Sequence, residues 1–390
     1  MANLTQIEPW TKVHDIHQAV ALYLTLQPLP PASIAEHVHD AQSQQFLIDQ
    51  LIANPHTIAY PPAADYQKKF WKSVVTVLEE KGVEIEEAIY ERLICTLNVP
   101  VRQGPPEASY LTYLLSRPKS RTISTATWRR PPAVDNFSQD YRPLTIRESR
   151  TTIERGTTGL RTWRASLDLS EWILQNYHII ASARVLELGS GVGLLGLLVA
   201  TLQQLARPAD VKQTSCIYMT DVDDDVLARC TSNVRLPCNM LADSPNVHVR
   251  ALDWEDSVNV DRQMFVWSLL KEIDADVILA ADVVYDLSII PPLTHTLRLA
   301  LERPLPVKQG ANNPQPLELG LQRTAYIALT LRREQTFAEF LASAERAGLV
   351  VEFIEMDLPP HNERVFRGSD DSTSGATDTT RLMRLVARGA

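Results

Sequence analysis

The sequence predicts an α/β fold: a mostly parallel, seven-stranded sheet with helices on both faces, preceded by a helical N-terminal domain. Three observations predict it. Short apolar segments alternate with helical segments from residue 184 to 387. The first of these strands ends in a glycine-rich turn, and the next ones end in acidic residues. The first 115 residues show apolar spacing typical of helices, interrupted by prolines.

Composition indicates an ordinary globular chain with enough residues for two domains. The 390 residues are 45% hydrophobic and 22% charged. The four cysteines form no C-x-x-C motif, and no signal peptide or long apolar segment is visible, so we expect a cytosolic or nuclear protein without a membrane span. The net charge of −9 argues against direct nucleic-acid binding. No motif indicates a bound metal or a second subunit, and we expect a monomer.

Residues 1–115 form the expected helical domain, followed by a basic, proline-containing linker at 116–143 and a catalytic domain at 144–390. In the helical domain, Ile85, Ile89 and Leu93 recur at helical spacing. Between residues 117 and 164, eleven Lys and Arg residues stand against four acidic ones. This basic stretch is either a solvated linker or a docking face for an acidic or RNA-associated partner.

The catalytic domain is expected to open with two extended segments, 144–146 and 151–153, and a helix that carries Trp163 and Trp172. Strands and helices then alternate, and the last two strands, joined by a loop, are expected to pair in antiparallel fashion at the sheet edge. The expected strands are 184–188, 216–220, 247–252, 275–281, 326–331, 350–356 and 381–387. The helices between them are expected at 194–205, 224–236, from about 289, and at 335–347.

The first strand of this series leads into a glycine-rich turn, which contains Gly189, Ser190, Gly191 and Gly193. Glycines let a ligand approach the backbone, and the following helix offers free N–H groups. The spacing also matches a dinucleotide fingerprint. However, Glu187 stands two residues before the first glycine, where its carboxylate would repel a pyrophosphate. A ligand that carries an amino group would be attracted instead.

Three further strands end in residues suited to a nucleoside ligand or to catalysis. Asp221 follows the second strand, in the position that binds ribose hydroxyls in such sheets. Asp253 and Trp254 follow the third, where the indole would flank an adenine ring. Asp282 and Tyr285 follow the fourth, three residues apart. The alternative role for Asp282 is a helix N-cap.

These residues together resemble the seven-β-strand (class I) protein-lysine methyltransferases. Three blocks carry the resemblance: GTTGLRTW at 156–163, VLELGSGVG at 185–193, and DVVY at 282–285, which fits that family's D-x-x-Y motif. The run from 156 to 171 is most similar to the elongation factor 2 lysine methyltransferases. The resemblance implies a Rossmann-like methyltransferase sheet and S-adenosyl-L-methionine as the cofactor.

The resemblance also implies a role for each matching position. Asp282 and Tyr285 would hold the incoming lysine. The implied cofactor contacts are Trp163, Gly189, Ser190, Gly191, Asp221, Trp254 and Ala281, to which the turn and the strand ends add Glu187, Gly193 and Asp253.

The expected function is therefore methylation of a lysine of elongation factor 2, with the helical domain recognising that protein. Three alternatives stay open: a lysine methyltransferase with another protein substrate, a non-catalytic protein that binds S-adenosylmethionine, and a nicotinamide oxidoreductase. The last would need a proton donor such as a Tyr-x-x-x-Lys pair, and neither Tyr66 nor Tyr326 has a lysine four residues later.

Overall fold

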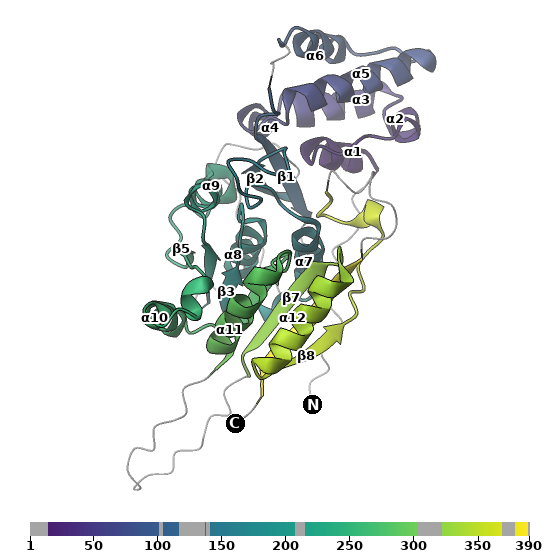
Figure 1. Cartoon of the computed structure of the whole chain (residues 1–390). Coiled ribbons are helices and arrows are strands. Elements are labelled where there is room, and N and C mark those ends of the chain that lie inside the picture. The colour runs from purple at the N-terminus through teal and green to yellow at the C-terminus, as the bar shows by residue number, and fades with distance from the viewer. Residues whose placement is uncertain are drawn as a thin grey trace.

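The computed structural model describes residues 15–100, 104–116, 137, 141–206, 215–302, 322–368 and 379–388. A helical domain lies at one end of the molecule, and a two-stranded hairpin connects it to a larger α/β domain (Figure 1). Most of the expected linker at 116–143 lies outside the described residues, and so does about half of the basic stretch at 117–164, namely 117–136 and 138–140. In the described part of the chain, no helix is both long and apolar enough to cross a membrane.

The helical domain is built around aromatic side chains. Trp71 is fully buried and meets Phe70 edge to face, with 5.2 Å between ring centroids, and Tyr23 packs on Phe70 at 4.7 Å. Such pairs contribute about 0.5–1.5 kcal/mol each beyond the burial of their area. The domain comprises α1 (Asp15–Leu24), α2 (Pro31–His37), α3 (Ala41–Leu47), α4 (Pro55–Ala59), α5 (Ala64–Glu80) and α6 (Glu87–Leu97), as expected for a helical region.

The connecting hairpin corrects two expectations. β1 (Ser109–Ser116) pairs antiparallel with β2 (Tyr141–Glu148), so the last residues of the supposedly helical region 1–115 form a strand. The expected extended segment 144–146 lies in β2 and pairs with β1, whereas 151–153 forms no strand. A short apolar run such as 110–115 cannot be assigned to a helix or a strand from its pattern alone.

The large sheet has seven strands in the order β5-β4-β3-β6-β7-β9-β8, which confirms the predicted count and the mostly parallel arrangement. β9 lies between β7 and β8 and is antiparallel to both, so the expected antiparallel pair is present. The strands are β3 (Arg184–Leu188), β4 (Cys216–Asp221), β5 (Val247–Ala251), β6 (Val277–Ala281), β7 (Thr324–Thr330), β8 (Leu349–Ile354) and β9 (Thr380–Ala387).

Helices cover both faces of this sheet, because successive side chains of each strand point to opposite faces. In β3, Val185 belongs to the core beneath α7 and α8, whereas Leu186 belongs to the core beneath α11 and α12 (Figure 1). The stretch 257–274 contains a helix whose apolar residues pack on the same core as Leu186. The helices are α7 (Arg164–Gln175), α8 (Leu194–Ala206), α9 (Asp224–Val234), α10 (Gln263–Ile273), α11 (Ile290–Leu301) and α12 (Glu334–Arg346).

Two buried asparagines join β2 to the α/β domain. The Asn239 side chain accepts a hydrogen bond from the Thr145 N–H at 2.8 Å and donates to the Thr145 carbonyl at 2.7 Å. Asn233 makes the same pair of bonds with Arg147, at 2.8 and 3.2 Å. These amides supply the hydrogen bonds that a neighbouring strand would make. The backbone groups of Thr145 and Arg147 at the edge of β2 away from β1 therefore have partners.

We predict that Asn239→Ala lowers the free energy of unfolding by about 2–4 kcal/mol, because it leaves buried groups of Thr145 without partners. Thermal denaturation followed by circular dichroism checks this. Ser232→Ala is the matched control, because Ser232 is exposed on nearby α9. Equal melting temperatures for the two variants would contradict the role assigned to Asn239.

Candidate active site

A cleft of about 500 Å³ opens where the carboxyl ends of β3, β4 and β6 meet. Parallel strands bring their ends to one edge of the sheet, and ligands bind in the crevice outside that edge. All predicted site residues except one line this cleft. The lining includes Trp163, Glu187, Gly189, Ser190, Gly191, Asp221, Asp253, Trp254, Ala281, Asp282 and Tyr285.

The glycine turn is shaped by close contacts as well as by backbone angles. Gly189 has φ +69°, and a Cβ there would lie 2.8 Å from the Val283 side chain. Gly191 has φ +54°, and its Cβ would lie 3.0 Å from the carbonyl oxygen of Gly159. Side chains at these two positions would therefore be strained and would crowd the cleft wall.

Gly193, expected to contact the cofactor, does not line the cleft. A Cβ at this position would lie 2.8 Å from the Sγ of Cys230 on α9. Because φ is +91°, the residue also adopts a conformation that favours glycine. Gly193 therefore permits the turn into α8 and its close packing on α9.

The polar groups of the turn are held across β3 and β4. The Ser190 N–H donates to the Thr220 carbonyl, and the Ser190 Oγ accepts from the Thr220 N–H, both at 2.9 Å. The Asp221 carboxylate accepts hydrogen bonds from the N–H groups of Gly191 at 3.1 Å and Val222 at 2.9 Å. Burial raises the pKa of Asp221 despite these bonds. The carboxyl group is thus fixed at the position expected for ribose recognition.

Glu187 is buried on the cleft floor, and burial raises the pKa of its carboxyl to about 8, assisted by the negative charge of Asp221. Its Oε2 has no hydrogen-bond partner among the described residues. A buried carboxyl oxygen without a partner costs free energy unless a donor or cation reaches it. Because Glu187 lines the cleft, its carboxyl suits the ammonium group of S-adenosylmethionine and would repel a pyrophosphate.

Asp253 and Trp254 form the part of the cleft wall that follows β5. The Asp253 Oδ1 accepts a hydrogen bond from the Glu255 N–H at 2.9 Å, which fixes the short turn that follows. The indole of Trp254 lies close to the glycine turn, since a Cβ on Gly189 would be 3.5 Å from it. Trp254 thus lines the cleft next to the glycine turn, and its role beside adenine stays a prediction.

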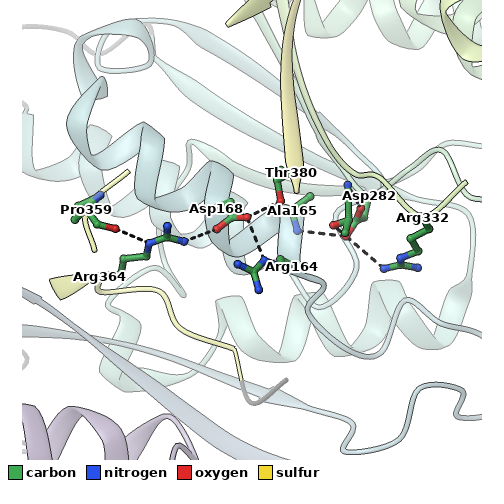
Figure 2. Close-up of polar contacts among 9 residues, drawn as sticks. Arg164, Ala165, Asp168, Asp282, Arg332, Pro359, Arg364 and Thr380 are labelled. Carbon is green, nitrogen blue, oxygen red and sulfur yellow. Dashed lines mark hydrogen bonds and ion pairs between the residues drawn. The ribbon is translucent and has the colours of Figure 1, made fainter. Parts of the chain in front are cut away.

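Asp282 connects three elements at the other side of the cleft. Its carboxylate accepts hydrogen bonds from the Thr330 N–H at 2.8 Å, the Thr330 hydroxyl at 2.9 Å and the Ala165 N–H at 3.2 Å (Figure 2). Thr330 ends β7, and Ala165 lies in the first turn of α7. The N-cap alternative is wrong, because Asp286 and not Asp282 caps the helical turn that follows the strand. Asp282 instead accepts a hydrogen bond from the first turn of α7, a helix more than a hundred residues earlier in the chain.

Asp282 also pairs with Arg332, a residue that the sequence analysis missed. The Arg332 Nη2 lies 3.6 Å from the Asp282 Oδ2, and the guanidinium lies over the Trp163 ring, 4.5 Å from its centroid. The indole N–H of Trp163 donates to the Thr158 carbonyl at 3.1 Å, which fixes the ring. Arg332 comes two residues after β7, and residues just after parallel strands lie at the same sheet edge. This position in the sequence could have identified Arg332 as a site residue.

Tyr285 stands at the mouth of the cleft with its side chain largely exposed. Partial burial raises the pKa of its phenol, and the charges of Asp221 and Asp286 add to this. A second cavity of about 240 Å³ adjoins the cleft, and the two share Asp282, Tyr285 and Arg332. The D-x-x-Y segment therefore stands between a cofactor-sized cleft and a separate opening.

The helix that carries the cleft wall is anchored at a second point. The Asp168 carboxylate on α7 accepts hydrogen bonds from Arg364 at 2.8 Å and from the Thr380 hydroxyl at 2.5 Å (Figure 2). One turn later, Glu171 accepts bonds from the N–H groups of Val365 and Phe366. These bonds hold α7 against the C-terminal segment, so Trp163 stands on a rigid support.

Comparisons with known proteins agree with this site. A lysine methyltransferase family matches residues 138–304. The human protein-lysine N-methyltransferase EEF2KMT is 29% identical over 353 residues, covering 88% of each chain. EFM3, a protein-lysine N-methyltransferase of Chaetomium thermophilum, is 28% identical over 88% of this chain and 90% of its own. The human putative protein N-methyltransferase FAM86B1 is 28% identical over 83% of this chain and 84% of its own.

Fold and cleft together define a class I methyltransferase that uses S-adenosylmethionine. Within that class, the chain is similar to protein-lysine methyltransferases. The oxidoreductase alternative is thereby set aside, in keeping with the unpartnered carboxyl of Glu187 where a pyrophosphate would have to bind.

We predict that S-adenosylhomocysteine, which carries the same ammonium group, binds with release of a proton near pH 7. With a pKa of about 8, Glu187 is largely protonated in the free protein at pH 7, and the ammonium favours its ionised form. Affinity should then rise with pH up to about pH 8, by at most about tenfold per unit. Calorimetric titrations in buffers of different ionisation enthalpy measure the proton count.

The control is Glu187→Gln, which keeps the side-chain shape and cannot ionise. This variant should bind more weakly and should lose the part of the pH dependence below pH 8. The same proton release in wild type and variant would show that another group titrates.

Proposed function

We propose that this protein transfers a methyl group from S-adenosylmethionine to the ε-amine of a lysine in translation elongation factor 2. The carrying observation is the placement of Asp282 and Tyr285 at the junction of the cofactor cleft and the second cavity. Similarity to EEF2KMT and EFM3 supports the substrate, because it covers most of the chain and so includes much of the helical domain. We also propose that the protein is cytoplasmic and monomeric.

The chemistry is an in-line displacement in which the cofactor supplies an electrophilic methyl group on a sulfonium. The nucleophile must be a neutral amine, whereas a free lysine with a pKa of about 10.4 is protonated at pH 7. Glu187, Asp221 and Trp254 would hold the two ends of the cofactor. Much of the barrier reduction then comes from proximity and orientation of the amine.

Asp282 is suited to position that amine. Its carboxylate is immobilised by the three neutral donors of Ala165 and Thr330, so its orientation does not depend on the substrate. It would accept a hydrogen bond from the amine and direct the lone pair toward the cleft. Tyr285 would close the opening around the aliphatic part of the lysine, because its exposed ring stands at the shared rim.

We also propose that the helical domain takes part in substrate recognition. The Arg150 guanidinium, next to the loop that forms the cleft wall, pairs with the Asp65 carboxylate on α5 at 2.5 and 2.8 Å. This bidentate pair ties the domain to the cleft. Because β1 belongs to the hairpin, removing residues 1–115 would also strip β2 of its partner, so point variants in the full chain are the better probe.

A methyltransferase with a different protein substrate is the second candidate. The similarity to the putative N-methyltransferase FAM86B1 favours it, because that relative covers nearly as much of this chain as EEF2KMT does.

We predict that purified elongation factor 2 receives labelled methyl from S-adenosylmethionine on one lysine, located by mass spectrometry. Asp282→Asn should reduce the rate at least about a hundredfold, because it removes the charge and misplaces a donor toward the amine. Binding of S-adenosylhomocysteine should stay within a few-fold of wild type.

Asp286→Asn is the matched control, because Asp286 lies in the same loop but caps the next turn through the Ser288 N–H. It should retain near wild-type activity. An Asp282-dependent signal in whole lysate without label on the factor would move the substrate to the second candidate. Intact cofactor binding with no label anywhere would favour a non-catalytic protein.

A further inference from the structure

The charge of the Asp282 carboxylate favours a protonation state of the target lysine that the proposed reaction cannot use. A carboxylate beside a lysine amine stabilises the ammonium form, which cannot attack a methyl group. The Asp282 side chain is only 7% exposed, so water screens its charge poorly. Its three hydrogen-bond donors, two from Thr330 and one from Ala165, are uncharged. A nearby cation is therefore needed to offset the negative charge of Asp282.

Arg332 is placed to do so. It is the one cation within ion-pair distance of Asp282 among the described residues, at 3.6 Å between Nη2 and Oδ2 (Figure 2). It also lines both cavities, so its charge faces the space where the amine would lie. We propose that Arg332 is a positioning residue that compensates the charge of Asp282 and so allows the target lysine to bind as the neutral amine. The inference rests on the proposed lysine transfer.

Arginine suits this task better than lysine would. The guanidinium stays charged across the working pH range, so the compensation does not fade as pH rises. Its Cζ lies over the Trp163 ring, 4.5 Å from the centroid, in a cation–π contact that holds it beside Asp282. Trp163 is in turn fixed by its hydrogen bond to the Thr158 carbonyl. The Trp163 ring thus holds the Arg332 guanidinium close to the Asp282 carboxylate.

The other ionisable groups around the two cavities leave this role to Arg332. Burial raises the pKa of Glu187 on the cleft floor to about 8, so this carboxyl is largely uncharged at pH 7. The other acidic residues of the cofactor cleft, Asp221, Asp223, Asp253 and Glu255, do not line the second cavity. Tyr285 carries a phenol whose pKa is raised, so it is neutral there. Arg161 lines the cofactor cleft and Arg333 the second cavity, and neither forms an ion pair with Asp282 within 4 Å.

The test is the pH profile of methyl transfer by Arg332→Met, which keeps a long side chain over Trp163 and removes the charge. Between pH 6.5 and 9.5, the apparent pKa of the rate should rise by about one unit. The rate should then be about tenfold lower at pH 7 and approach that of wild type at the alkaline end. Arg332→Lys should restore most of the rate at pH 7. Binding of S-adenosylhomocysteine should stay within about twofold, with an unchanged melting temperature.

Arg346→Met is the matched control, because Arg346 is an exposed arginine at the end of α12 that lines neither cavity. Its profile should follow that of wild type. A loss of the same factor at every pH in Arg332→Met would overturn the inference in favour of a structural role. A faster variant with a lower KM would overturn it as well, because Arg332 would then be blocking the lysine.

The wild-type enzyme in the same series separates this inference from the proposed substrate. If wild type methylates elongation factor 2 and the two profiles are parallel, the inference alone is wrong. If wild type leaves that factor unlabelled, the proposed substrate is wrong, and the same profiles are taken on the Asp282-dependent acceptor in whole lysate.

Discussion

The Asp282 carboxylate is the constraint on which the rest of the site depends. It joins the end of β6 to the end of β7 through Thr330 and binds the first turn of α7 through the Ala165 N–H. Asp282 itself has φ +54°, an unfavourable conformation for a residue other than glycine, and these bonds hold it there. Because Trp163 immediately precedes α7, one carboxylate sets the position of the cleft wall, the sheet edge and the group nearest the substrate.

Electrostatics divide the cleft into two regions with different tasks. On the cofactor side, Glu187 is buried with an unpartnered oxygen, so the floor favours a ligand that brings a positive charge. On the substrate side, the carboxylate of Asp282 is offset by Arg332, so the surroundings favour an uncharged nucleophile. A reaction between a sulfonium and a neutral amine needs both conditions within one low-dielectric space.

The helical domain is coupled to this site through polar contacts of limited number. Asn233 and Asn239 bind the edge of β2 as a strand would, and Arg150 pairs with Asp65 next to the cleft loop. Each contact is specific in direction, because amide and guanidinium donors must meet matching acceptors. These contacts hold β2 on the α/β domain and connect α5 to the segment that leads into the cleft wall.

The sequence by itself determined the parts of the protein that depend on local pattern. Alternating strand and helix periodicities specified the seven-stranded sheet, and the glycine turn with Glu187 and the DVVY segment specified a methyltransferase cleft. Residues at strand ends could be grouped in advance because parallel strands bring their carboxyl ends together. Eleven of the twelve predicted site residues accordingly line one cleft.

Only the tertiary structure decided what depends on contacts between distant segments. The pairing of β1 with β2 spans a stretch with no local signal, and the packing of Gly193 against Cys230 requires α9 to be in place. The cation–π contact of Arg332 with Trp163 joins residues 169 positions apart in the chain, and no periodicity records it. Side-chain hydrogen bonds and ion pairs form only where the folded backbone brings their partners together. The sequence therefore identified Asp282 as a site residue, but it did not show which residues surround its carboxylate.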